Sequence, residues 1–277
     1  MIKEFPREKS LGEFTFYRST DAITSAMELA DDPNKRVDCK NSYNLTSIED
    51  ANYFCNNFNH NNNYNNGYTK LQLGDAIRIL DGTYNIYYQI AGFDCEYNRP
   101  ASDGTVYDNG YGIMLVPYWY GNESMKGYWN NSDTTSGGYK SSLAQGSANY
   151  VGSIIKSNVL GDHLVTRKAL LSSRINSNGN ANNFEWVNVY ATLPSLGQLF
   201  GFFNYNNTIY DDGEANYKLP IFNYFSWAKT FDYWLRNIGD YSDTHYKVYN
   251  IMKQSGYHIL NYVMSDEKYY MPLLYIR

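Results

Sequence analysis

The stretch from Phe231 to Arg277 constrains the fold of this chain most strongly. Apolar residues around Trp234 and Leu235, and again from Pro272 to Ile276, bracket about thirty residues that are mostly Tyr, Asn, Asp, Ser and His. Two apolar segments of this kind indicate buried frame strands, and the polar residues between them must then lie at the surface. Tyr offers a large contact area at low rotamer cost, and Asn, Ser and Asp add adaptable hydrogen bonds. We interpret the stretch as a binding surface on a rigid frame.

The whole chain is rich in the same residue types. It contains 30 Tyr and 34 Asn, together 64 of 277 residues, whereas only 18% of the residues are charged. An A/T-rich genome would favour both residues through their codons. Whatever the cause, the composition predicts a surface rich in hydroxyl groups, amides and aromatic rings.

The charge of the chain excludes some partners. Its net charge is −5, with no basic run longer than Lys35-Arg36, which argues against duplex nucleic acid and against an anionic membrane surface. The N-terminus is charged and has no apolar core, so we expect no secretory signal, and no apolar run is long enough to cross a bilayer. We therefore expect a chain that is made and assembled in a cytoplasm or exported without a Sec signal, with no nucleic-acid binding and no membrane insertion.

No motif for catalysis, metal binding or a cofactor is evident. Cys39, Cys55 and Cys95 lack CxxC spacing, which predicts small buried thiols. The four histidines have no second ligand nearby in sequence, and there is neither a GxSxG motif nor a phosphate-binding loop. The acidic cluster from Asp211 to Glu214 could supply oxygen ligands to calcium, but a solvated turn is the preferred interpretation. We expect no catalytic residues, no metal and no cofactor.

Residues 1–66 are predicted to form a small helical or irregular attachment segment. Thr46 and Glu49 have the spacing of a capping box, and apolar residues follow at helical period up to Phe58. Asp21 could start an earlier helix that ends before Pro33. The Asn-rich tract of residues 56–67 is interpreted as a loop or linker.

Residues 67–277 are predicted to form one loop-rich, mainly antiparallel α+β domain. A hairpin is expected across Asp81-Gly82, a buried strand over 112–120, an amphipathic helix within 139–160 and a short helix from Ser195. The segment 163–175 is apolar at first and then ambiguous between helix and strand. Short strands and Gly- and Asn-rich loops follow as far as the terminal segment MPLLYIR.

Several sequence blocks follow one another in a recognisable order over roughly residues 70–277. They are IAGFD (90–94), MLVPYWY (114–120), MKGYWNNSDTTSGGYKSSL (125–143), LGDHLVTRKALLSS (160–173), EWVNVYATLPSLGQLFG (185–201), DDGEANYKLPIFNY (211–224), FDYWLRNIGD (231–240) and YYMPLLYIR (269–277). The order of these blocks resembles that in a family of bacteriophage minor structural proteins from phages and prophages of low-GC Gram-positive bacteria.

The terminal arrangement is also similar to the C-type-lectin-like fold of phage tropism determinants and of relatives of formylglycine-generating enzymes. The resemblance implies a compact scaffold that displays ligand-binding side chains near its C-terminus. Two departures are visible. The Arg of the family's terminal VRP motif is replaced within Tyr270-Met271-Pro272, and no Cys after Cys95 could match the catalytic cysteines of the enzymes.

The resemblance implies a non-enzymatic virion protein of a tail tip, baseplate or tail fibre that contributes to host adhesion. The expected partners are other virion proteins, further copies of the chain in a homo-oligomer, and a polysaccharide or protein of the host cell surface. One alternative is a purely structural component such as a head fibre, capsid decoration or collar piece. A second is a glycan-cleaving enzyme.

The candidate ligand-binding residues lie between the two frame segments, with Trp234 and Arg236 supporting them from below. The adenine-rich codons of Asn could also mutate to give many of these residue types, as in a diversified tropism protein, although codon bias along the whole chain is the preferred explanation. The candidates are Tyr241, Asp243, His245, Tyr246, Tyr249, Asn250, Tyr257, His258, Asn261 and Tyr262.

Overall fold

The computed structural model has an α+β fold with few helices and mainly antiparallel strands. It describes residues 42–58, 71, 73–100, 106–120, 125–132, 134, 136–175, 181–200, 204–205, 208–209, 218–223, 232–242, 245–251, 258–261 and 266–277.

Three α-helices and sixteen strands lie in these residues. The helices are α2 (Ile48–Phe58), α3 (Leu143–Ile155) and α4 (Leu196–Phe200). The strands are β1 (Ser42–Leu45), β2 (Ala76–Leu80), β3 (Asn85–Phe93), β4 (Arg99–Pro100), β5 (Val106–Tyr107), β6 (Ile113–Tyr120), β7 (Lys126–Gly127), β8 (Arg167–Ile175), β9 (Ala181–Val189), β10 (Asn204–Tyr205), β11 (Thr208–Ile209), β12 (Tyr233–Ser242), β13 (His245–Ile251), β14 (His258–Asn261), β15 (Lys268–Tyr269) and β16 (Leu274–Ile276).

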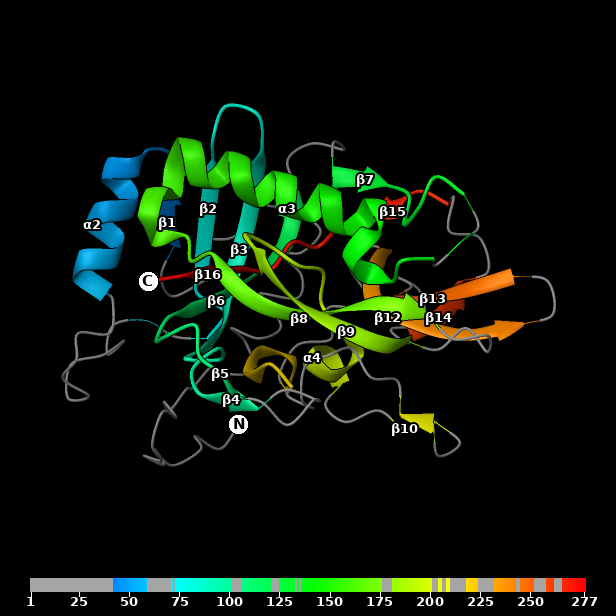
Figure 1. Cartoon of the computed structure of the whole chain (residues 1–277). Coiled ribbons are helices and arrows are strands. Elements are labelled where there is room, and N and C mark those ends of the chain that lie inside the picture. The colour runs from blue at the N-terminus through cyan, green and yellow to red at the C-terminus, as the bar shows by residue number, and fades with distance from the viewer. Residues whose placement is uncertain are drawn as a thin grey trace, which may run out of the picture.

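Two five-stranded sheets organise the described chain. The main sheet has the order β1-β2-β3-β6-β16, and the second sheet has the order β14-β13-β12-β15-β7. All neighbours are antiparallel except the pairs β1–β2 and β12–β15. Figure 1 places β12, β13 and β14 at one end of the molecule and α2 with β1 at the other.

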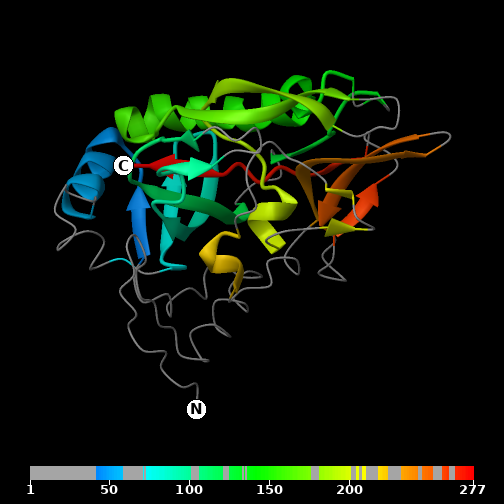
Figure 2. The same cartoon turned by 60° about the horizontal axis from the view of Figure 1, so that its bottom comes forward.

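Helix α3 covers the main sheet because its apolar residues recur at helical spacing. Its buried residues include Ala144, Ala148, Val151 and Ile155, which lie on one face. Ser142 caps the helix by accepting a hydrogen bond from the backbone N–H of Gln145. In Figure 2, α3 and the β8–β9 hairpin lie side by side above the main sheet.

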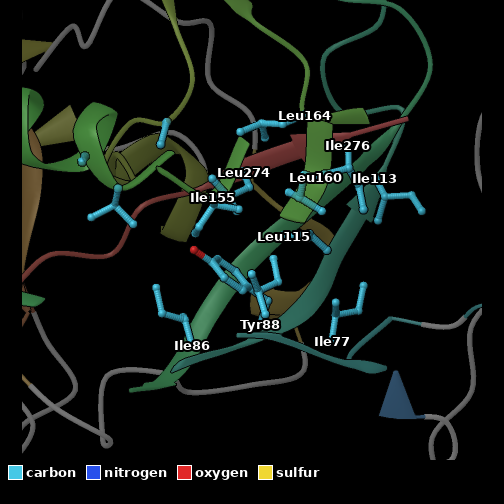
Figure 3. Close-up of a cluster of buried hydrophobic side chains, with 14 of the residues drawn as sticks. Ile77, Ile86, Tyr88, Ile113, Leu115, Ile155, Leu160, Leu164, Leu274 and Ile276 are labelled. Atoms are coloured by element: carbon cyan, nitrogen blue, oxygen red, sulfur yellow. The ribbon is translucent and has the colours of Figure 1, made fainter. Parts of the chain in front are cut away.

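The main core lies between this helical layer and the strands. Figure 3 shows Ile155 and Leu160 facing Tyr88, Leu115 and Leu274 from three strands of the sheet. Burial of a large apolar side chain contributes about 1.5–3 kcal/mol. The core therefore depends on residues that are far apart in sequence.

The last strand, β16, ends the strand order of the main sheet, and other segments of the chain cover its outer side. It pairs with β6 on one side, while the Val165 N–H donates to the Tyr275 carbonyl on the other at 2.9 Å. Nearby, the Leu273 N–H donates to the Thr192 carbonyl at 2.8 Å. Three distant parts of the chain thus converge on the C-terminal strand.

Several predicted elements are confirmed. The hairpin appears as β2 and β3, the buried strand as β6, the amphipathic helix as α3, and the short helix as α4. The hairpin turn is one residue later than Asp81-Gly82, because Asp81 and Tyr84 close it around Gly82 and Thr83. The expected helix that starts at Asp21 lies outside the described residues.

The predicted N-terminal segment does not stand apart where the structure describes it. Strand β1 pairs with β2, and Ala51, Phe54 and Cys55 of α2 are buried in the main core. Residues 42–58 therefore share one core with the rest of the described chain, whereas the predicted boundary at 66 separates them. Attachment by residues 1–66 stays a prediction.

The cap of α2 also differs from the predicted Thr46–Glu49 box. Ser47 Oγ accepts from the Asp50 N–H at 3.2 Å, and the Asp50 carboxylate accepts from the Thr46 N–H and hydroxyl at 2.9 and 2.8 Å. The cap is thus a Ser-x-x-Asp motif one residue further on. The two candidate pairs have equal spacing, so the sequence could not distinguish them.

Candidate recognition surface

The frame strand β12 begins with six consecutive buried residues. Tyr233 and Leu235 pack into one hydrophobic cluster, while Trp234 and Ile238 pack into the main core. A strand buried on both faces has a fixed position, because neither face can move without opening a cavity. The predicted burial of Trp234 is confirmed.

Two tryptophans lock this strand to the segment before α3. The indole N–H of Trp234 donates to the Gly127 carbonyl at 2.9 Å, and that of Trp129 donates to the Leu235 carbonyl at 3.1 Å. Both side chains are fully buried, and a buried indole N–H needs such an acceptor. These two bonds tie β12 to β7 and to the residues that directly follow β7.

Polar residues of β12 fix it to the loop before α4. The Arg236 N–H donates to the Pro194 carbonyl at 3.1 Å, and Asn237 Oδ1 accepts from the Leu196 N–H at 2.6 Å. Arg236 itself is buried. Burial also raises the pKa of the neighbouring Tyr233 hydroxyl, which therefore stays protonated. Trp234 and Arg236 are both buried, and their support of the candidate binding residues stays a prediction.

The polar residues between the two frame segments form the rest of the sheet. Beyond Ile238 the chain runs through the end of β12, turns into β13 and returns as β14, giving a three-stranded antiparallel meander. We call β12–β14 the meander. Strand β13 has seven residues, so at about 3.4 Å per residue it spans about 20 Å. Figures 1 and 2 both show the meander at the end of the molecule opposite α2.

The strand register brings predicted site residues from different positions next to one another. His245 lies opposite Ser242, next to Tyr241 at the first turn, and Asn250 lies opposite the buried Trp234. On the other side of β13, His258 lies opposite Ile251, and Asn261 lies opposite Val248. Tyr246 and Tyr249 lie within the same central strand.

The structure thus gathers the backbone of seven of the ten predicted site residues on three paired strands. Asp243, Tyr257 and Tyr262 lie outside the described residues, as does the acidic cluster from Asp211 to Glu214. The bulges in the β12–β13 pairing, between Trp234 and Ile238 and between Gly239 and Ser242, could not be predicted from the sequence. Such bulges re-aim side chains along a strand.

The structure also places cysteines and a histidine that lie outside the meander. Cys55 and Cys95 are buried, as predicted, whereas Cys39 lies outside the described residues. His163 bridges the Arg277 carbonyl at 2.7 Å and Asn52 Oδ1 at 2.8 Å. Within the part of the chain that the structure describes, no three His, Cys, Asp or Glu side chains are grouped to hold a metal ion. In that part, no helix combines the length and apolarity needed to cross a bilayer.

Comparison of the chain with models of protein families, with curated proteins and with solved structures gave no match.

Proposed function

We propose that this chain is a non-enzymatic bacteriophage virion protein of a tail tip, baseplate or fibre whose meander contacts the host envelope. One observation carries the proposal. The Tyr-, Asn- and His-rich stretch follows a strand segment buried on both faces and forms paired strands at the end of the molecule opposite α2 (Figure 1). A C-type-lectin-like scaffold with the same division into frame and display region is part of the proposal.

A glycan of the cell envelope is the partner that suits this surface best. Tyr and His rings pack on the apolar faces of sugars, and Asn and Asp side chains bond to their hydroxyl groups. Rigid strands reduce the conformational entropy lost on binding. Several copies in a homo-oligomer would multiply a weak single contact through avidity.

The experiment compares binding of the labelled full chain and of two variants to cells of a low-GC Gram-positive host. One variant replaces three meander residues, as His245→Ala, Tyr246→Ala and Tyr249→Ala. The control is Tyr150→Ala, which removes a tyrosine of α3 that is 60% exposed. We expect the wild type and the control to bind and the triple variant to bind at least about tenfold more weakly, the equivalent of about 1.4 kcal/mol.

Three other results would oppose the proposal. Equal binding by the triple variant would show that these meander residues do not contact the host envelope. No binding by the wild type, together with tight self-association, would favour a structural component such as a collar or capsid decoration. Release of reducing sugar from host wall polymers would favour a glycan-cleaving enzyme.

A further inference from the structure

A second exposed aromatic site lies on the loops that connect β3 with β6. The rings of Tyr97 and Tyr111 stack with their centroids 4.1 Å apart and their planes at 23°. Tyr97 is 37% exposed, whereas most aromatic residues of the described core are buried. Stacking on Tyr111 fixes the orientation of the Tyr97 ring. We call this pair the tyrosine platform, and the sequence did not single it out.

Backbone turns hold both tyrosines in place. Asp94 and Asn98 on either side of Tyr97 adopt left-handed conformations, with φ of 54° and 51°. The Tyr97 N–H donates to the Asp94 carbonyl at 3.1 Å, and the Asp94 N–H donates to the Gly112 carbonyl at 2.7 Å. Asp and Asn are the non-glycine residues that adopt this region most readily, so these turns suit their residues, and the two backbone hydrogen bonds give the loop a defined shape.

A buried polar network supports the platform from behind. Glu96, next to Tyr97, forms a 3.0 Å ion pair with Arg167, whose other nitrogen donates to Thr192 Oγ1 at 2.8 Å. Asn109, two residues before Tyr111, donates to Glu96 Oε2 at 3.2 Å and accepts from the Lys168 N–H at 2.7 Å.

All the ionised groups of this network are excluded from solvent, with Glu96 and Arg167 at 1% and 0% exposure. Desolvating two charges costs several kcal/mol, so such a pair contributes little net stability compared with apolar residues. Its clear effect is on geometry, because Glu96 is held against Arg167 of β8 and also accepts from Asn109 of the loop that carries Tyr111. Binding sites that are fixed in advance need this kind of support.

From this geometry we infer that the tyrosine platform binds a pyranose ring of a glycan. An aromatic face of fixed orientation suits the apolar C–H face of a sugar, and a few polar groups at its edge suit the hydroxyl groups. Exposed Asn98 and Asp108 provide an amide and a carboxylate on the same loops. A stable protein interface would need a larger apolar centre than this pair offers.

The platform is separate from the meander, so the inference does not depend on the proposed function. Figure 1 shows β4 and β5, which lie between the two tyrosines in sequence, below β6 and away from β13 and β14. The loops are instead joined to the main sheet, since the Tyr275 hydroxyl donates to the Gly110 carbonyl at 2.8 Å. Two sites on one chain would allow a polymer to be held at two places.

Saturation-transfer NMR of the full chain tests the inference. The probes are methyl glycosides of glucose, galactose, N-acetylglucosamine, N-acetylgalactosamine and rhamnose. We expect the wild type to bind at least one of them, Tyr97→Ala to bind it about tenfold more weakly, and Tyr97→Phe to retain binding because the ring is kept. Tyr53→Ala, which removes a 70% exposed tyrosine from α2, is the matched control and should bind as the wild type. Thermal unfolding verifies that each variant is folded.

The inference is overturned if the wild type binds none of the probes or if Tyr97→Ala binds as well as the wild type. A change of oligomeric state in Tyr97→Ala without glycoside binding would identify a protein interface instead. The triple meander variant should still bind the glycoside. If that variant loses the signal and Tyr97→Ala keeps it, the glycoside binds at the meander and not at the tyrosine platform.

Discussion

A buried ion pair fixes the geometry of this protein although it adds little to its stability. Arg167 and Glu96 form an ion pair inside the protein, whereas Lys140 and Glu185 form one at the surface. In the interior, loss of one partner leaves the other charge buried and unpaired. At the surface, water solvates the remaining charge. The two pairs therefore offer a direct comparison.

We expect Arg167→Met to destabilise the protein by about 3–5 kcal/mol, because Glu96 stays buried without its partner. Lys140→Met is the control and should leave the urea midpoint close to that of the wild type. Urea unfolding followed by circular dichroism gives both values. Equal effects of the two substitutions would contradict the assigned role of the buried pair.

Two buried tyrosines make the opposite comparison. The Tyr88 hydroxyl has no hydrogen-bond partner among the described residues, and Figure 3 shows this side chain within the apolar core. Burial raises the pKa of this hydroxyl well above 10.0, so it stays protonated. The Tyr139 hydroxyl, in contrast, accepts from the Leu193 N–H at 2.7 Å.

Tyr88→Phe should therefore keep the free energy of unfolding or raise it by about 1 kcal/mol, since it removes an unsatisfied polar group. Tyr139→Phe should lower it by about 1–3 kcal/mol, because the Leu193 N–H loses its acceptor. Chemical denaturation measures both changes. A loss in Tyr88→Phe as large as that in Tyr139→Phe would show that the hydroxyl has a partner.

The Cys55 thiol should be chemically inert in the folded protein. Burial raises its pKa from 9.0 to about 12, so the reactive thiolate is absent at neutral and mildly alkaline pH. We expect iodoacetamide to modify Cys55 in urea but not under native conditions at pH 8, as read by peptide mass spectrometry. Native labelling of this thiol at the rate seen in urea would contradict its burial.

At the scale of elements, neighbouring residues were enough to predict a helix whose own sequence has a clear apolar period or capping residue. The period of apolar residues in α3 and the Ser195 start of α4 could both be read from neighbouring residues, and Gln198 and Ser195 indeed cap each other at 2.9 and 3.0 Å. Strand β9 could not be read in this way, because ANNFEWVNV gains its strand character from pairing with β8. The parallel pairing of β1 with β2 likewise depends on a distant partner.

The cap of α2 gives an element-scale prediction. Hydrogen bonds from Thr46 lower the pKa of the Asp50 carboxyl below its ordinary 3.8. The stabilisation is therefore present at neutral pH and is lost as the pH falls through this lowered pKa. Asp50→Ala should cost about 0.5–1 kcal/mol at pH 7 and less near pH 2. Glu49→Ala is the control, because Asp50 and not Glu49 makes the cap, and a larger cost for Glu49→Ala would restore the predicted box.

At the scale of the whole molecule, the sequence could indicate the frame of the candidate site but not how distant segments pair. The apolar runs around Trp234 and from Pro272 to Ile276 identified the frame, because continuous apolar character marks burial. Neither the pairing of β16 with β6 nor the register of the meander follows from such a run, because β16 pairs with residues about 160 positions earlier and the meander register depends on how three strands pair. The tyrosine platform also depends on chain folding that no local pattern predicts, because its two tyrosines are fourteen positions apart.

Cryo-electron microscopy of the intact particle bound to isolated host wall tests the proposed recognition surface most directly. If the meander is the recognition surface, density for the wall should contact β13, β14 and the turns that join them, with α2 facing the particle. The opposite arrangement, with the meander enclosed between virion subunits and the wall contacted by another protein, would contradict the central claim.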